Sequence, residues 1–176
     1  IVTILALHGG GIEPATTELA YTIAHCGDYN YFSFKGMRSK GNNELHVTST
    51  HYDDQIALDL VRGSQRTVAI HGCEGNESVA YIGGSDDRLI ELITESLEDI
   101  GISVREAPHH ISGTQENNIV NMTQTQGGVQ LELTAQLRKE LFKNRKSSRK
   151  NRENKDNWDD LMYDFADAMK KAIERA

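Results

Sequence analysis

The stretch IVTILALHGGGIEP, residues 1–14, decides how this chain is organised. Ile1 to Leu7 is a continuous apolar, β-prone run, which is typical of a central strand in a parallel sheet. The glycines after His8 allow a sharp backbone turn, and Pro14 suits the first turn of a following helix. We therefore expect the Glu13 carboxylate to return beside the His8 imidazole. Zinc accepts both groups as ligands.

The remainder of the chain alternates short β-prone runs with helical patterns. This alternation favours a single α/β domain over residues 1–176, an open mixed, mainly parallel sheet flanked by helices on both faces. A serine, Ser85, is a candidate cap for the longest central helix. Strands are predicted at 1–7, 29–34, 45–50, 67–70, 78–82, 102–107 and 129–133, and helices at 14–25, 53–61, 86–100, 134–142 and 158–176.

The composition is that of a soluble globular protein, with 38% hydrophobic and 26% charged residues among 176. No apolar run approaches the roughly 18 residues that span a membrane, and no signal-peptide pattern is visible. We expect synthesis in the cytoplasm, with action outside the cell after lysis or release, and further residues before Ile1. Two cysteines, Cys26 and Cys73, make no disulfide framework, which favours a reducing compartment.

Charge is unevenly distributed along the chain. Residues 138–155 hold nine Lys or Arg and two Asp or Glu, whereas the remainder holds 10 basic and 24 acidic residues, a balance of −14. We expect a basic, mobile surface loop at 143–157. Such a segment on an acidic body indicates an anionic partner nearby.

Two histidines stand where predicted strands end. In open α/β sheets, sites form at the carboxyl ends of strands, and His8 and His71 each end a strand and precede glycine. With Glu13 they make a His, Glu, His set that matches a three-ligand catalytic zinc site, although manganese or cobalt suits the same donors. Taken singly, each has a structural interpretation, such as a turn histidine or an acid at a helix start. A phosphate cradle is the alternative for the glycine run, which lacks the usual spacings.

Glu132 is the candidate general base. Strand alternation places Gln130 and Glu132 on one face of the 129–133 strand and the apolar residues on the other. A carboxylate facing a metal-activated water is a suitable base, and a solvent-facing strand glutamate is the alternative.

Several short motifs occur in a recognisable order: HGGGIE at 8–13, LHVTST at 45–50, His71-Gly72, Gly83-Gly84, NIVN at 118–121 and GVQLE at 128–132 through Leu137-Arg138. Together, over roughly Leu5 to Arg138, they resemble the bacteriophage and Bacillus poly-γ-glutamate hydrolase family. The resemblance implies a compact zinc carboxypeptidase-like fold and hydrolysis of γ-amide bonds in poly-γ-glutamic acid, a capsule or slime polymer. It also implies zinc on His8, Glu13 and His71, with Glu132 as base.

The polymer's α-carboxylates suggest arginine partners, because guanidinium binds carboxylate through two hydrogen bonds. Arg38, Arg88 and Arg138 are the candidates, each with a structural alternative. We expect His46, His51 and Asn118 to line the substrate pocket, and His109-His110 to be exposed. The expected enzyme is a monomer that neither enters a membrane nor binds nucleic acid. The alternatives are a zinc hydrolase of small N-acyl amino acids and a non-catalytic domain that binds anions or nucleic acid.

Overall fold

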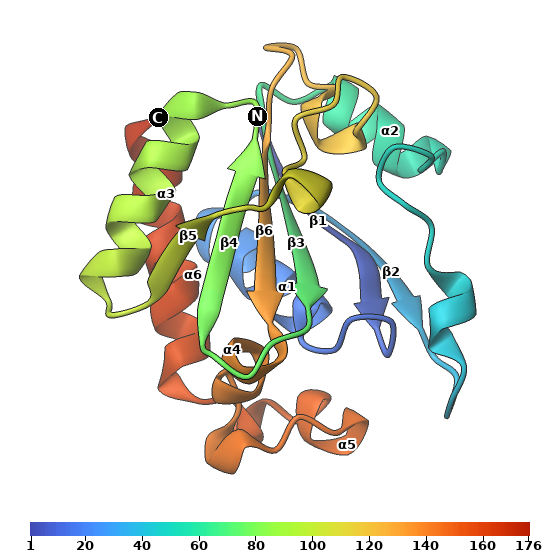
Figure 1. Cartoon of the computed structure of the whole chain (residues 1–176), viewed down its shortest axis with the longest axis vertical. Helices are drawn as coiled ribbons and strands as arrows, with labels where there is room; N and C mark the ends of the chain where they lie inside the picture. The colour runs from blue at the N-terminus through green and yellow to red at the C-terminus, as the bar shows by residue number, and fades with distance from the viewer.

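The computed structural model describes all 176 residues and is built on one six-stranded sheet (Figure 1). The strand order is β2-β1-β3-β6-β4-β5. β4 and β6 are antiparallel, and every other neighbouring pair is parallel, so the predicted mixed, mainly parallel α/β sheet is confirmed. The strands are β1 (Val2–Gly10), β2 (Asn30–Gly36), β3 (Arg66–Cys73), β4 (Val79–Gly84), β5 (Ser103–Glu106) and β6 (Val129–Thr134).

The two faces of the sheet are covered differently. On one face, helices α1 and α3 pack on the strands and α6 packs against both, enclosing a core of 30 buried hydrophobic residues. The opposite face carries a smaller cluster of seven, shared with α2 and the 3₁₀ turn η3. This thinner cover leaves room for a site. The helices are α1 (Thr16–Gly27), α2 (Gln55–Arg62), α3 (Asp87–Asp99), α4 (Ala135–Glu140), α5 (Arg149–Arg152) and α6 (Asp160–Arg175), and η3 is Ile119–Asn121.

A β-bulge in β1 decides which way His8 points. Ala6 pairs with Ser33 and Gly9 with Lys35, so β1 has one more residue than β2 over this interval. Simple alternation would place His8 with Ala6, which faces α1 and the large core. The extra residue instead re-aims His8 toward the thinner face. There its ring lies 4.9 Å, centroid to centroid, from that of His71.

Three helices begin at aspartates that satisfy free backbone N–H groups. Asp54 accepts from Ala57 N before α2, and Asp159 accepts from Leu161 N before α6. Before α3 the cap is Asp86, which accepts from Leu89 N, so the assignment of Ser85 as the cap is corrected by one residue. Because Asp86 also pairs with Arg66 of β3, the start of α3 is fixed to the sheet.

The strand predicted at 45–50 is wrong. Residues Asn42–Leu45 form a 3₁₀ turn (η1), and the backbone after it joins no sheet. This segment crosses the thinner face, and the carbonyl of Val47 accepts a hydrogen bond from His8 Nε2 at 2.7 Å. The backbone of this segment therefore hydrogen-bonds to a histidine of the site and not to a neighbouring strand.

The segment predicted as a loop at 143–157 lies at the surface and contains three short helical turns: η4 (Lys143–Arg145), α5 and η5 (Lys155–Asn157). Trp158 is buried beneath it, and its indole N–H donates to the Arg152 carbonyl at 2.8 Å. No helix in the structure has the length and apolar character needed to cross a membrane.

Candidate metal centre and flanking cavities

A tight turn after β1 brings Glu13 beside His8. The Glu13 N–H donates to the His8 carbonyl at 2.8 Å and closes the turn. Gly10 has a φ of +62°, which disfavours a side chain, and a Cβ at Gly9 would lie 2.0 Å from Thr17 Oγ1. The turn thus requires glycine at both positions.

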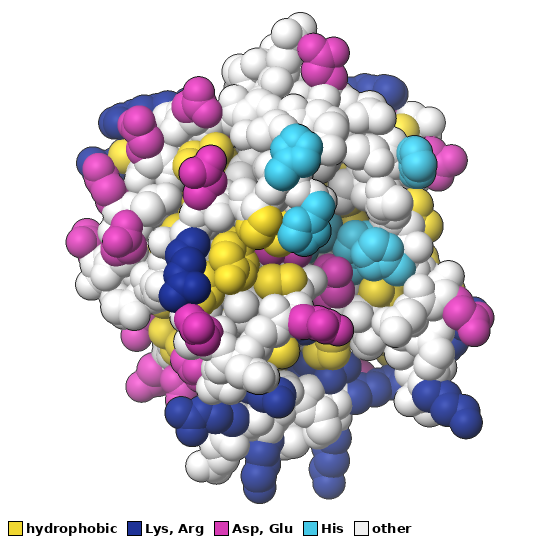
Figure 2. All heavy atoms as spheres, in the orientation of Figure 1, with side chains coloured by type: hydrophobic (Ala, Val, Ile, Leu, Met, Phe, Trp, Pro, Cys, Tyr) yellow, Lys and Arg dark blue, Asp and Glu magenta, His cyan; other side chains and the backbone are white.

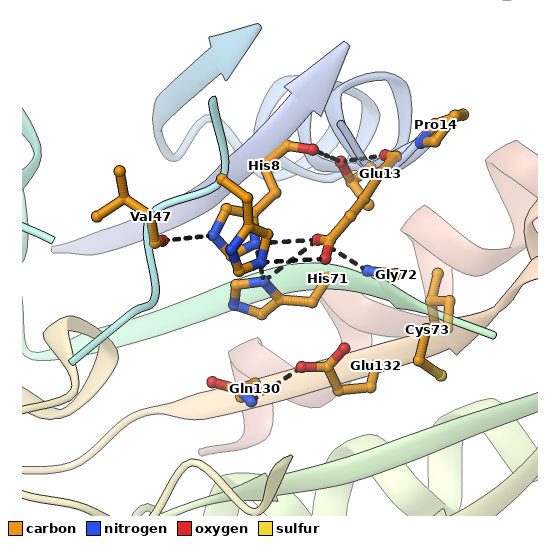
Figure 3. A network of polar contacts seen from close by, with 12 residues as sticks. His8, Glu13, Pro14, Val47, His71, Gly72, Cys73, Gln130 and Glu132 are labelled. Atoms are coloured by element: carbon orange, nitrogen blue, oxygen red, sulfur yellow. Dashed lines mark hydrogen bonds and ion pairs between the residues drawn. The ribbon is translucent and has the colours of Figure 1, made fainter. Parts of the chain in front are cut away.

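Three potential ligand atoms converge at this point (Figure 3). His8 Nδ1 lies 3.1 Å from Glu13 Oε1 and 3.1 Å from His71 Nδ1, and His71 Nδ1 lies 3.5 Å from Glu13 Oε1. Both histidines are buried, with 3% and 2% of their surface exposed. Ligand atoms on a tetrahedral zinc, each about 2.0–2.1 Å from the metal, lie about 3.3 Å apart. The three observed distances therefore fit three corners of such a site.

Hydrogen bonds outside the triad fix how its members are presented. His8 Nε2 donates to Val47 O, so in the neutral ring Nδ1 carries the lone pair that faces Glu13 and His71. The Gly72 N–H donates to Glu13 Oε1 at 3.1 Å and holds the carboxylate in place. His71 Nε2 is buried without a hydrogen-bond partner. Lone pairs that converge in a buried space are the arrangement that a cation stabilises, so the donor set fits zinc.

His46 offers a second combination with His8 and Glu13. Its ring stacks on His8 at a centroid distance of 3.8 Å, and its Nε2 lies 3.8 Å from Glu13 Oε2. The His46 side chain is 42% exposed and stands on an irregular segment, whereas His71 is fixed within β3. The His71 atoms therefore lie closer to those of His8 and Glu13 on a rigid strand, whereas the more exposed His46 lies at the rim.

Glu132 lies next to His71 in the sheet, since the two residues are in register between β6 and β3. Its Oε1 accepts from Gln130 Nε2 at 3.1 Å, and Gln130 Oε1 accepts from Asn118 Nδ2 at 3.1 Å. Asn121 donates to the carbonyls of Gly113 and Gln115 and so fixes the adjacent loop. The carboxylate is thus oriented by a chain of amide side chains.

Burial and neighbouring charges shift the acid–base properties of the site. Burial, reinforced by the charge of Glu13, raises the pKa of Glu132 to about 7. Burial opposes ionisation of Glu13 as well, but hydrogen bonds and charges from His71 and His8 hold its pKa well below the ordinary value. Burial disfavours protonated His71, yet the charges of Glu132 and Glu13 leave its pKa raised. One carboxylate is therefore permanently ionised and the other is poised near neutrality, which suits a ligand and a base.

Two cavities meet at the triad. The first, about 350 Å³, is lined by His8, Glu13, His71 and Glu132 together with polar residues of the crossing loops. The second, about 470 Å³, extends from Glu13 and His46 past Pro14 to Arg138. Glu13, His46, Gly72 and Cys73 line both. Histidine side chains gather near the centre of the face shown in Figure 2. The site is consequently accessible from two sides.

The predicted binding residues are placed unequally. Asn118 and His46 line the first cavity, and Arg138 lines the second. The Arg138 guanidinium donates to the carbonyls of Leu133, Pro14 and Cys73, which ties together the ends of three strands. The structure does not bring the other three to either cavity: Arg88 lies on α3 and pairs with Glu91, Arg38 pairs with Glu44, and His51 is exposed outside the lining.

Sequence reasoning missed several residues of the first cavity. His110, expected only as an exposed loop residue, is exposed and also lines the cavity wall, and Gln130, for which the sequence predicts only a strand face, lines the cavity as well. The remaining polar lining residues include Thr48, Ser49, Thr50 and Gln115. Their signal was the density of hydroxyl and amide side chains in loops beyond the strand ends.

Comparison with known proteins identifies the family of the chain. The sequence profile described as poly-gamma-glutamate hydrolase matches residues 1–168. The chain belongs to this family. A solved structure of a bacteriophage poly-gamma-glutamate hydrolase has a TM-score of 0.94 and 32% identity, covering 99% of this chain and 83% of that one. A structure described as YndL, apo and zinc-free, gives 0.91 and 31%, with 98% and 84% coverage.

Curated relatives of this poly-gamma-glutamate hydrolase family member come from Bacillus subtilis (strain 168). The SPbeta prophage-derived UPF0714 protein YoqZ is 39% identical over 80% of the chain, and the UPF0714 protein YndL is 34% identical over 80%. The matches span 52% and 56% of those two proteins, so the chain covers about half of their length. The UPF0714 protein YmaC is 32% identical over 99% of the chain and 72% of its own length.

Proposed function

We propose that this protein hydrolyses the γ-amide bonds of poly-γ-glutamic acid in a zinc-dependent reaction. The observation that carries the proposal is the triad of His8, Glu13 and His71, whose ligand atoms lie 3.1–3.5 Å apart with Glu132 alongside. Membership of the poly-gamma-glutamate hydrolase family supports the substrate. The YndL relative, whose structure is described as zinc-free, supports zinc as the metal.

When bound, zinc would polarise the amide carbonyl and make a neighbouring water more acidic. The chain supplies the remaining chemistry. Glu132 accepts a proton from water as the water attacks the carbonyl carbon, and then returns that proton to the leaving nitrogen. The ordered amides of Gln130 and Asn118 keep its carboxylate directed at the cavity.

A donor is also needed for the oxyanion that develops during attack. His46 and Asn118 both line the first cavity and are the side chains that we propose for this role. Burial and the charge of His8 lower the pKa of His46, which favours the neutral imidazole. A neutral imidazole can donate a hydrogen bond without adding a permanent charge beside the metal.

Access from two sides favours an internal cut. One part of the polymer would occupy the first cavity and the other part the second, with the scissile bond over the triad. Arg138 lines the second cavity, and its three hydrogen bonds leave two guanidinium N–H groups for a substrate carboxylate. We propose a monomer that acts on capsule or slime polymer outside the cell in which it is made.

The test is the chain length of poly-γ-glutamate after incubation with the protein, with chelator and with zinc restored. We expect rapid shortening that chelator stops and zinc restores. Persistence of full-length polymer with a zinc-loaded sample would reject the polymer as substrate. Turnover of small N-acylglutamates in that sample would then identify the narrower amidohydrolase.

A further inference from the structure

We infer that the basic segment, residues 143–155, is a docking surface for the polyanionic chain, separate from the catalytic cavities. This inference rests on the proposed substrate and specifies how a long polymer is held. The segment follows α4, the helix that carries Arg138, and lies beyond the carboxyl ends of β1, β3 and β6 (Figure 1). Lys and Arg side chains gather along the lower edge of the face that carries the histidines (Figure 2).

The segment offers cations that nothing in the protein neutralises. Its ion pairs use two arginines, Arg149 with Glu153 and Arg152 with Glu18. Five further cations are exposed without a carboxylate partner: Lys143, Arg145, Lys146, Lys150 and Lys155, the last of which lies over the Tyr21 ring. Outside residues 138–155 the chain has a balance of −14, which repels a polyanion. A polyanion is therefore attracted to this segment in preference to the rest of the surface.

Several contacts order the backbone that carries these cations. Arg152 is buried, donates to the Ser147 carbonyl at 2.7 Å, and its own carbonyl accepts from Trp158. Asn144 and Arg145 have left-handed φ values of +58° and +56°, which residues other than glycine rarely adopt. The cations are thus presented on a preorganised backbone.

A direct contact links the segment to the rim of the second cavity. The Arg149 guanidinium donates to the Met37 carbonyl at 3.2 Å, and the chain from Met37 continues to Asn43, which lines that cavity. Arg138 lines the same cavity immediately before the segment begins. A polymer leaving the cavity on this side therefore meets the basic segment next.

The chemistry favours a polycarboxylate over a nucleic acid. Proteins that hold single strands combine cations with aromatic side chains on which bases stack. The basic segment contains no aromatic residue, the adjoining Phe142 and Trp158 are buried, and the exposed ring of Tyr21 is covered by Lys155. It offers charge without a stacking platform, which suits a flexible chain of carboxylates.

The test compares two triple variants that change net charge equally. The first is Lys143→Gln, Lys146→Gln, Lys150→Gln. The control is Arg62→Gln, Lys171→Gln, Arg175→Gln, on exposed positions of α2 and α6. For long polymer we expect the first variant to raise KM about fivefold or more with kcat unchanged, because rim charges act on association. A short γ-glutamyl oligomer should show less than a twofold change, and the control should match the unaltered protein on both substrates.

Binding is measured separately from turnover, as retention on immobilised poly-γ-glutamate of zinc-loaded Glu132→Gln protein with and without the two triple changes. We expect only the 143/146/150 variant to elute at clearly lower salt. Equal elution of both variants would overturn the docking surface even if the polymer is cleaved. Stronger retention of the protein on a single-stranded oligonucleotide, lost with the same three lysines, would replace the polymer with nucleic acid as the partner.

Discussion

His71 and Glu132 are direct neighbours across β3 and β6, in register and on the same face of the sheet. The proposed metal ligand and the proposed base are thereby fixed by one strand pairing. Replacing Glu132 with Gln keeps the shape and removes the proton acceptor. We expect zinc content to remain and turnover of poly-γ-glutamate to fall by about 10²–10⁴-fold. Elemental analysis and initial rates measure the two effects, with exposed Glu106→Gln as control. Normal turnover in Glu132→Gln would exclude Glu132 as the base.

Substitutions of His71 and His46 discriminate between the two triads that share His8 and Glu13. His71→Ala removes a proposed ligand, and we expect zinc affinity to weaken by more than about 100-fold, whereas His46→Ala should weaken it by less than about tenfold. Competition with a chromophoric chelator measures both affinities, and circular dichroism checks the fold. The opposite order of effects would transfer the third ligand to His46.

Glu132 also makes stability depend on pH in the metal-free protein. Its folded-state pKa is raised from 4.5 to about 7, so its favourable contribution is complete below pH 4.5 and is lost as pH rises to 7. Glu132→Gln does not titrate. Its stability advantage over the unaltered protein should therefore grow by up to about 3 kcal/mol between pH 5 and pH 8. Urea unfolding with chelator present measures the difference in the free energy of unfolding between the two proteins. A difference that stays constant with pH would show that burial does not raise the pKa of Glu132.

Gln130 tunes the base through its hydrogen bond to Glu132 Oε1, which lowers the Glu132 pKa. In Gln130→Leu this stabilisation of the carboxylate is lost. We expect the acidic limb of the kcat/KM profile to move to higher pH, because the ionised form is the base. Bound zinc lowers the Glu132 pKa in both proteins and so leaves the direction unchanged. Profiles of the two proteins with zinc in excess give the shift, and a shift to lower pH would refute the assigned role of Gln130.

The buried pair of Glu18 and Arg152 fastens the basic segment to α1. Arg152→Ala leaves the Glu18 carboxylate, whose pKa burial already raises, without its cation. We expect a loss of about 3 kcal/mol in the free energy of unfolding at pH 7. The double variant Glu18→Gln, Arg152→Met removes both charges and should recover most of it. Denaturant midpoints measure both, and a double variant no more stable than Arg152→Ala would show that packing, and not charge, sets the loss.

Sequence periodicity predicted the strands and helices well where apolar residues recur on one face. Alternation also placed Gln130 and Glu132 correctly together, since both face away from the large core. Periodicity failed where contacts between residues distant in the sequence determine the position of a segment. The segment around His46 has β-branched residues, but it lies over the site and not in the sheet, and Arg88 faces solvent on α3. Neither position can be deduced from local spacing.

The direction of His8 was equally beyond alternation, because it depends on one extra residue in β1 relative to β2. The position of the His8 imidazole therefore depends on this bulge in β1. A regular β1 of the same residues, paired with β2 without the bulge, would carry the imidazole into the layer where Ala6 meets α1, and a polar ring would occupy apolar packing. Because of the bulge, the adjacent side chains of Leu7 and His8 share the thinner face, so an apolar contact and a proposed metal ligand follow one another in the sequence on the same side of the sheet.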